Sequence, residues 1–390
     1  MRKVLLLIVI LTSAACGRQG DSSEWPTEKW ETISSEEGGV NLDAIDRVQG
    51  SLQSKMYGYI DHYLVVHDGH LLVNKFYEND YVRVNRGKDE EPAPYNYYST
   101  EWHPFYQDSE LHILQSVTKS VTALVIGASL QRGDFPPVDS AAMDYFTGYQ
   151  IEEQELKDEI TIEDLLTMRS GIFWNEWDYE INDERNAVTQ MENSDDWIQY
   201  VLDLPMSHSP GEAFVYNSGG SQLLSAIFKS TTGQDVDEYA QQHLFDPLGI
   251  DEYYWKKTPG GFADTEGGLY LKAEDLAKIG YLVLQKGSWD GHQIISEEWI
   301  EAMTSPHIED IYPEDPELDF GYGYQWWLLN PLMEGSDREI EIYAGFGYGG
   351  QRLFIVPELD LVAVIYGWNI YSPQRSTIDL FIEEVLPAME

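Results

Sequence analysis

Short stretches rich in apolar, β-branched and aromatic residues lie near both ends of the chain, between polar segments, and this pattern is typical of β-strands. Residues 62–67 and 70–77 predict two strands, and Asp68-Gly69 between them is a dipeptide typical of tight hairpins. Near the other end, the same kind of pattern predicts four more strands, at 321–329, 339–344, 352–357 and 361–367. We therefore expect one sheet that is built from both ends of the chain.

Apolar residues at helical spacing occupy much of the sequence between these strands. The first such stretch covers about residues 41–57. Further helices are predicted at about 116–133, 161–168, 196–202, 221–228, 236–244, 273–285 and 372–386. Because residues 136–232 show several helical patterns and few strand signals, we expect them to form a helical subdomain. The predicted fold class is α/β, in its α+β form.

The N-terminal residues 1–16 have the pattern of an export signal. Two basic residues precede an apolar run over 4–11, and small residues then lead to Cys16, the only cysteine in the sequence. This arrangement resembles the lipobox of bacterial lipoproteins, although Ser13 stands where that pattern prefers leucine. The resemblance implies an exported protein that a lipid on Cys16 anchors to a bacterial membrane, on its periplasmic or cell-surface side.

The polar residues 17–39 show no sustained period, so we expect a flexible tether there. Residues 40–390 are expected to form the folded domain, since a chain of 390 residues with 43% hydrophobic content can bury a substantial core. The charge is strongly acidic, with 24 basic against 68 acidic residues and a net charge of −44. Nucleic acids and anionic membrane surfaces are therefore excluded as expected partners, because both bind basic patches.

The main candidate for chemistry lies in residues 111–133, where Lys119 follows Ser116 after three positions. On a helix that begins near Ser116, the lysine lies about one turn further along the same face, so its amine can reach the serine oxygen. A lysine can take the serine proton when burial or neighbouring charge makes its ammonium acidic. The start of the helix also offers unpaired backbone N–H groups, which can stabilise a developing oxyanion.

Ser-x-x-Lys alone is a weak signal, since about one match is expected by chance in a chain of this composition. The alternative is a capped helix whose lysine points to solvent. Two further segments bear on the choice.

Tyr216 and Ser218 form the first of these segments, just before the helix predicted at 221–228. Gly219 and Gly220 allow a tight turn, so the side chains before them can project into a cleft. A tyrosine beside a cationic lysine can exist partly as phenolate and pass a proton to a leaving group. The alternative is packing, which most of the 26 tyrosines must serve.

The second segment is the glycine-rich run 344–351 (AGFGYGGQ), directly before the strand predicted at 352–357. Glycines at a strand edge let a substrate approach the backbone closely, and an N–H there can pair with that of the serine around an oxyanion. The alternative is an ordinary glycine-rich hairpin.

Taken together, these segments occur in the order found in the serine β-lactamase-related hydrolases. That family includes class C β-lactamases, penicillin-binding carboxypeptidases, and esterases and amide hydrolases of the same fold. Longer stretches resemble it too, among them ITIEDLLTMRSGI, SPGEAFVYNSGGSQLLSAIF and GYGGQRLFIVPELDLVAV. The resemblance covers about residues 40–386. It implies the β-lactamase/transpeptidase-like fold, an antiparallel sheet with flanking helices and the inserted helical subdomain.

The resemblance also implies roles for individual residues. Ser116 would be the acylated nucleophile, Lys119 its base, and Tyr216 a proton carrier to and from the leaving group. Ser218 stands where β-lactamases usually have asparagine, and the N–H of Tyr348 would join that of Ser116 in the oxyanion hole. The other residues expected around the substrate are Gly347, Gly349 and Gln351.

One departure from the family pattern concerns the substrate. Gly345-Phe346-Gly347 has no lysine or histidine where β-lactamases and carboxypeptidases hold a substrate carboxylate. We therefore expect a small ester or amide, and the GYGGQ segment resembles the branch that contains 6-aminohexanoate-dimer-type hydrolases. The alternatives are a D-stereospecific carboxypeptidase acting on cell-wall peptides and a non-catalytic cell-envelope binding protein.

No cofactor or metal is expected, because the histidines are scattered without metal-ligand spacing. Glu176 is one conceivable base for deacylation among many acidic loop residues. The expected partners are a small ester, amide or peptide substrate and, through the lipid alone, a membrane.

Overall fold

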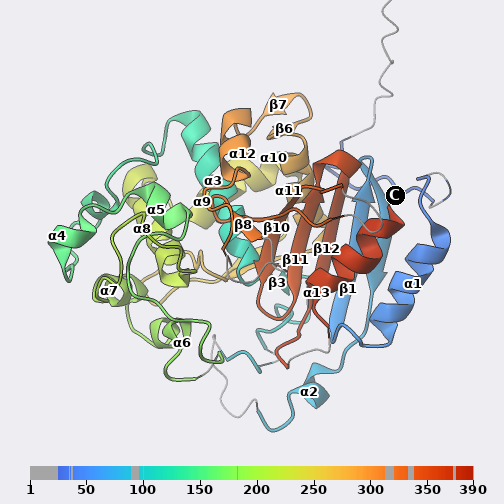
Figure 1. Cartoon of the computed structure of the whole chain (residues 1–390), viewed down its shortest axis with the longest axis horizontal. Coiled ribbons are helices and arrows are strands. Elements are labelled where there is room, and N and C mark those ends of the chain that lie inside the picture. Colours follow the sequence, from blue (N-terminus) through green and yellow to red (C-terminus); the bar gives the residue numbers. More distant parts are fainter. Residues whose placement is uncertain are drawn as a thin grey trace, which may run out of the picture.

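The structure is a computed structural model that describes residues 25–34, 36, 38–88, 96–99, 101–181, 183–311, 320–332, 338–371 and 375–389. Cys16, the expected export signal and the first part of the expected tether lie outside the described residues. Figure 1 shows a twisted sheet beside a largely helical region, with the described helices distributed over both.

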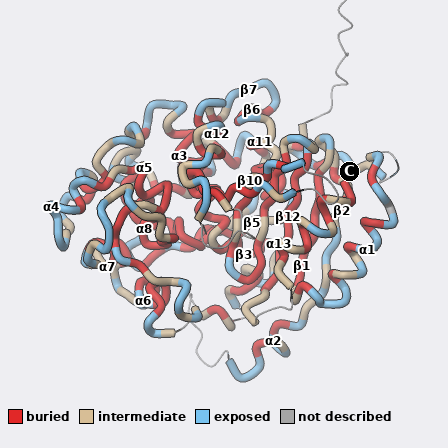
Figure 2. The backbone as a smooth tube through the Cα atoms, in the orientation of Figure 1, coloured by how far each residue is buried: buried red, intermediate tan, exposed pale blue. Residues whose placement is uncertain are grey.

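Among the described residues, seven strands form one antiparallel sheet in the order β2-β1-β12-β11-β10-β9-β8. Their bounds are β1 (Ile60–His67), β2 (His70–Phe76), β8 (Phe320–Tyr322), β9 (Trp327–Leu329), β10 (Ile342–Gly347), β11 (Gln351–Val356) and β12 (Leu361–Gly367). β1 pairs with β12, so the sheet is built from strands near both ends of the chain, as the sequence predicted. Figure 2 shows how completely these central strands are buried, and every residue of β12 is buried.

Helices cover both faces of the sheet. One face packs against α3 (Val117–Arg132) and α11 (Ala273–Leu284). The other face packs against α1 (Leu42–Gln53) and the C-terminal turns α13 (Thr377–Leu380), η4 (Phe381–Val385) and η5 (Leu386–Ala388). The rings of Phe354 on β11 and Phe381 on η4 stack with centroids 3.9 Å apart. Because both faces are covered, the inner strands are nearly continuous apolar runs rather than alternating ones.

The expected helical subdomain is present between residues 136 and 232, where the described residues form helices, loops and isolated bridges (Figure 1). Its elements are η1 (Ala142–Tyr145), α4 (Gln154–Lys157), α5 (Ile162–Leu166), α6 (Ala187–Glu192), α7 (Trp197–Leu202) and α8 (Ser218–Thr232). Helix α8 begins three residues before the predicted start, because the Asn217 side chain accepts a hydrogen bond from Gly220 N at 2.8 Å and caps it.

The remaining elements connect these two parts. They are α2 (Tyr81–Val84), β3 (His112–Ile113), α9 (Val236–Ala240), η2 (Gln241–Phe245), α10 (Asp246–Leu248), β4 (Tyr254–Trp255), β5 (Leu269–Leu271), β6 (Ser288–Trp289), β7 (His292–Gln293), α12 (Glu297–Met303) and η3 (Pro357–Leu359). A turn at Asp290-Gly291 joins β6 to β7. No helix in the described part of the chain is long and apolar enough to cross a membrane.

Part of the expected tether belongs to the folded domain. Trp30 is buried and its Nε1 donates to Glu274 O at 3.0 Å, while Trp25 packs against the rings of Tyr281 and Trp289. A parallel bridge joins Thr32 to β2. The tryptophans are the reason, since their large apolar surfaces gain free energy when they are buried on the domain.

Candidate active site

Ser116 and Lys119 lie in hydrogen-bond contact at the start of α3. Lys119 Nζ donates to Ser116 Oγ at 2.8 Å and to the backbone oxygen of Glu266 at 2.6 Å. Only 1% of Lys119 is exposed, so the alternative of a solvent-facing lysine is wrong. Gln115 has φ 49, in the left-handed region, and this turn sets Ser116 at the helix start.

Tyr216 is held beside the lysine by stacked aromatic rings. Its ring centroid lies 5.3 Å from Lys119 Nζ. Trp177 stacks on the Tyr216 ring at 5.5 Å, and Trp327 on β9 also stacks on it at 5.5 Å. These neighbours fix the plane of the ring, and therefore the direction of the phenol oxygen, next to Ser116 and Lys119.

The glycines of strand β10 allow that strand to lie against the turn before Ser116. A Cβ added at Gly347 would lie 2.3 Å from Leu114 O, and one added at Gly345 would lie 3.0 Å from Val117 Cγ1. Glycine is therefore needed for a close approach between two backbone segments. The approach brings Tyr348, the next residue, to the mouth of the site.

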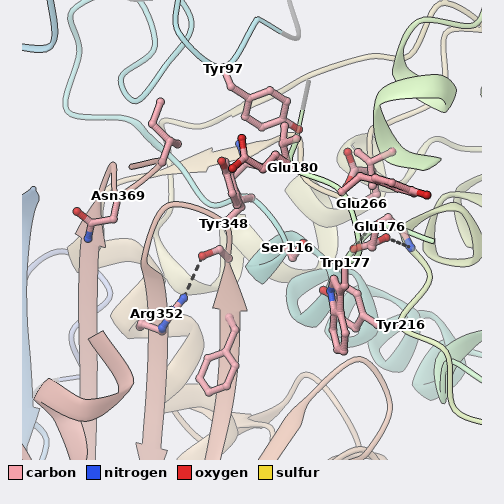
Figure 3. Close-up of a pocket in the computed structure, with 18 of the residues that line it drawn as sticks. Tyr97, Ser116, Glu176, Trp177, Glu180, Tyr216, Glu266, Tyr348, Arg352 and Asn369 are labelled. Carbon is pink, nitrogen blue, oxygen red and sulfur yellow. Dashed lines mark hydrogen bonds between the residues drawn. The ribbon is translucent and has the colours of Figure 1, made fainter. Parts of the chain in front are cut away.

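The backbone N–H groups of Ser116 and Tyr348 are candidates for an oxyanion hole. Among the described residues, neither group donates a hydrogen bond to the protein. Figure 3 shows Ser116 between Tyr348 on one side and Glu176 and Tyr216 on the other. A substrate carbonyl placed at Ser116 would thus find proton carriers on one side and the β10 backbone on the other.

These residues line one pocket of about 600 Å³. Aromatic side chains form much of its wall, and glutamates and one arginine also contribute to it. The lining residues include Tyr97, Ser116, Glu176, Trp177, Tyr216, Ser218, Glu266, Trp327, Phe346, Gly347, Tyr348, Arg352 and Asn369. A pocket of this volume can hold a small molecule.

Ser218 places Glu176 in the site. Glu176 Oε2 accepts from Ser218 N at 3.0 Å and also from Trp174 Nε1, while Oε1 accepts from Ser218 Oγ at 3.2 Å. The structure thus brings in the one acidic residue that the sequence had offered as a base, although no sequence signal distinguished it from other loop acids. Burial raises the pKa of Glu176, and the positive charge of Lys119 opposes that rise.

The groups around Lys119 act against the effect of its burial. Burial acts to lower its pKa, but Tyr216, Glu266, Glu176 and Asp264 act in the opposite direction, and the net pKa is raised. Burial also raises the pKa of Tyr216. In the resting site, these four neighbouring groups therefore outweigh the effect of desolvation on the pKa of Lys119.

Two residues expected around the substrate do not line the pocket. The Gln351 side chain is fully buried, where Nε2 donates to Tyr348 O at 3.0 Å and to Gly367 O at 2.6 Å. A Cβ added at Gly349 would lie 2.9 Å from the Trp368 ring. Both residues shape the β10–β11 turn from inside, because the turn needs a tight backbone and bonds to its carbonyls.

The sequence did not single out several of the lining residues, among them Glu266, Arg352 and Asn369. Glu266 Oε2 lies 3.6 Å from Lys119 Nζ, so it pairs with the lysine through its side chain as well as its backbone. The glycine pair after Glu266 was the one available signal, and a Cβ added at Gly268 would lie 2.5 Å from the Asp264 Cβ.

A second buried group of ionisable side chains adjoins the first through Asp264 and Glu266. Lys256 Nζ lies 3.0 Å from His103 Nε2. Burial lowers the pKa of Lys256 to about 8 and raises the pKa of Asp264 to about 7. No group of three or more His, Cys, Asp or Glu side chains in the described part of the chain could hold a metal ion.

The comparisons with known proteins agree with this geometry. A family model described as Beta-lactamase matches residues 62–375. The chain is 27% identical over 281 residues to the 6-aminohexanoate-dimer hydrolase of Paenarthrobacter ureafaciens, and 66% of each chain is covered. It is 29% identical over 293 residues to the lovastatin esterase of Penicillium rubens, covering 65% of this chain and 72% of the esterase.

A solved structure shows the same fold. It is a Bacillus anthracis protein with a provisional assignment as a 6-aminohexanoate-dimer hydrolase, and it aligns with a TM-score of 0.68 over 93% of this chain and 87% of that chain. At 19% identity, this likeness concerns the fold alone. Because the family model matches most of the chain, the protein belongs to the Beta-lactamase family.

Proposed function

We propose that this protein is a serine hydrolase that cleaves a small ester or amide through an acyl-enzyme on Ser116. The main support is the 2.8 Å contact between Lys119 Nζ and Ser116 Oγ, because Ser116 and Tyr216 line the same pocket. Nucleophile, proton carriers and two free backbone donors then surround one point, which is the arrangement that acyl transfer requires.

In acylation, Ser116 Oγ attacks the carbonyl carbon, and its proton passes to the pair formed by Lys119 and Tyr216. The pair can accept that proton only after it has lost one of its own, since the pKa values of both members are raised in the resting site. Activity should therefore rise with pH, and the apparent pKa belongs to the pair rather than to either residue.

The oxyanion that forms on the substrate is held by the N–H groups of Ser116 and Tyr348. Collapse of this intermediate breaks the bond to the leaving group, which takes the proton from the pair. A water molecule then attacks the acyl-enzyme, gives its proton to the pair, and releases the acid while Ser116 Oγ recovers its proton. No step requires a metal or cofactor.

The relatives support an ester or amide substrate, because their names describe the hydrolysis of an aminohexanoate dimer and of lovastatin. The match covers 66% of the length of the aminohexanoate-dimer hydrolase. The substrate class of this chain is therefore proposed and is not transferred from that relative. The segment 345–347 lacks a lysine or histidine for a substrate carboxylate, which disfavours a carboxypeptidase.

The test is hydrolysis of p-nitrophenyl acetate by the wild type and by Ser116→Ala. The variant should lose at least about a thousandfold in kcat/KM while its thermal unfolding stays close to that of the wild type. Wild-type activity in a folded Ser116→Ala variant would exclude Ser116 as the nucleophile. A wild type with neither turnover nor acylation would leave the binding-protein alternative.

We also propose export and lipid anchoring through Cys16, on the sequence pattern alone. In a bacterial host, the full chain should enter the membrane fraction and partition into detergent. Cys16→Ser should move the protein to the soluble extracytoplasmic fraction, and a variant that stays with the membrane would contradict the proposal.

A further inference from the structure

Arg352 lies on one side of the Gly347–Tyr348 backbone, and Ser116 and Tyr216 lie on the other side. It pairs in register with Phe346 across strands β11 and β10, and it lines the pocket. Its Nη1 donates to Gly347 O at 2.9 Å and to Gln351 O at 2.7 Å. Figure 3 shows the bond to Gly347 directly beside Tyr348.

The bond to Gly347 has a chemical consequence for Tyr348. The carbonyl of Gly347 and the N–H of Tyr348 belong to one planar peptide group. A cation that donates to the carbonyl withdraws electron density from the whole amide, and so makes its N–H a stronger donor. The same bond also fixes the plane of the peptide, and therefore the direction of the N–H.

The charge of Arg352 is not used by an acidic partner. Among the described residues it forms no ion pair, whereas Arg185 lies 2.7 Å from Asp183 and Arg132 lies 3.9 Å from Asp134. Burial lowers the pKa of Arg352 to about 10, so the guanidinium remains charged at neutral pH. Its carbon Cζ lies 5.0 Å from the Phe346 ring centroid, which covers one face.

A half-buried cation without a carboxylate partner among the described residues is unusual in a chain with 68 acidic residues against 24 basic ones. Arginine serves here where lysine would serve less well, because one planar group can donate to two backbone carbonyls and stack on a ring. Its two acceptors are both at the turn that carries Tyr348, and this turn forms one side of the candidate oxyanion hole.

We propose that Arg352 is a positioning residue for the oxyanion hole, acting on the Gly347–Tyr348 peptide to orient and polarise the Tyr348 N–H. This rests on the proposed function, because the donor matters only if an oxyanion forms at Ser116. The effect belongs to the transition state, in which the carbonyl oxygen carries its charge. Loss of Arg352 should consequently lower kcat and leave KM nearly unchanged.

The test compares Arg352→Met and Arg352→Lys with the wild type on p-nitrophenyl acetate, and uses Arg132→Met as the matched control on an exposed arginine. Arg352→Met should lower kcat by about 10- to 100-fold, less than the loss of a whole oxyanion donor. KM should stay within about twofold. Arg352→Lys should recover part of the loss, since an ammonium can still donate to Gly347 O.

A second readout is the inhibition constant of phenylboronic acid, which forms a tetrahedral adduct with a serine. This inhibition constant should increase in Arg352→Met by about the same factor as kcat/KM falls. Thermal unfolding is measured for each variant, and if Arg352→Met does not fold, Arg352→Lys and Arg352→Gln carry the comparison.

Three results would overturn the proposal. An unchanged kcat in a folded Arg352→Met variant would mean that the bond to Gly347 O does not affect the reaction. A rise in KM alone would make Arg352 a substrate contact. A loss confined to p-nitrophenyl hemiglutarate, with none for the acetate, would make it a carboxylate-binding residue. In each case the wild type still turns over, so these outcomes are distinct from failure of the proposed function.

Discussion

Two buried lysines of this protein have opposite protonation tendencies. Lys119 is 1% exposed and Lys256 is 4% exposed, so burial alone would lower the pKa of both. The pKa of Lys256 does fall, to about 8, whereas the pKa of Lys119 is raised. The two side chains share Asp264 and Glu266 as neighbours, and they differ in the other groups around them.

The remaining neighbours differ between the two lysines. Lys119 also faces Tyr216 and Glu176, which line the pocket. Lys256 also faces Glu192, whose pKa burial raises well above its ordinary value. Burial by itself therefore does not make a lysine a base, and Lys119 is distinguished as the proposed base by its contact with Ser116.

The largest expected effect comes from Lys119→Met, which removes the amine but keeps most of the side-chain volume. Acylation should slow by about 10²- to 10⁴-fold, because the serine proton loses its acceptor. The burst of p-nitrophenol in rapid mixing measures this step. Normal acylation in the folded variant would place the base elsewhere.

Tyr216→Phe should have the next largest effect. The phenylalanine ring can keep its stacking on Trp177 and Trp327, so the change isolates the hydroxyl. We expect a loss of about 10- to 100-fold in kcat/KM, largest for substrates with poor leaving groups that need a proton. Equal losses for p-nitrophenyl and alkyl esters would argue against a proton carrier.

Glu176→Gln tests the charge around Lys119 through the pH profile. The Glu176 carboxylate raises the pKa of Lys119, so its removal should lower that pKa and move the rise of kcat/KM to lower pH. The sign is fixed, since less negative charge favours the neutral amine. A profile that stays in place, or moves to higher pH, would contradict the electrostatic account of the site.

Lys256→Met should have the smallest effect on activity, less than about threefold, and a clearer effect on stability. Lys256 lowers the pKa of Asp264, so its loss should raise that pKa further above the unfolded value. The folded variant then keeps a proton that the folded wild type loses near pH 7, so its unfolding free energy should fall more steeply with rising pH than that of the wild type, from about pH 6 upward. Parallel thermal melts across that range measure the difference.

Local patterns in the sequence predicted the parts of the site that depend on neighbours along the chain. Ser116 and Lys119 are one helical turn apart, so their contact follows from α3 alone. The sheet from both chain ends was also predictable, because its strands are short stretches rich in apolar residues near each end. The residue at which the tether ends and the folded domain begins was not predictable, since Trp30 packs against α11, a distant segment of the chain.

Residues whose roles depend on distant segments could not be identified in this way. Glu266 reaches Lys119 across 147 positions of sequence, and Glu176 is selected only by its bonds to Ser218, 42 positions away. Gln351 was expected at the substrate because it lies in the glycine-rich segment. Its side chain instead turns inward to bind backbone groups of Tyr348 and Gly367, a direction that the sequence pattern does not specify.

The most direct test of the acyl-enzyme is the intact mass of the folded domain after brief mixing with p-nitrophenyl acetate. We expect a gain of one acetyl group on the wild type, assigned by peptide mapping to Ser116, and none on Ser116→Ala. Incubation with a penicillin in parallel tests the carboxypeptidase alternative, for which a lasting adduct would be expected. An acetyl group on another residue, or turnover of the ester by folded Ser116→Ala at the wild-type rate, would contradict the account.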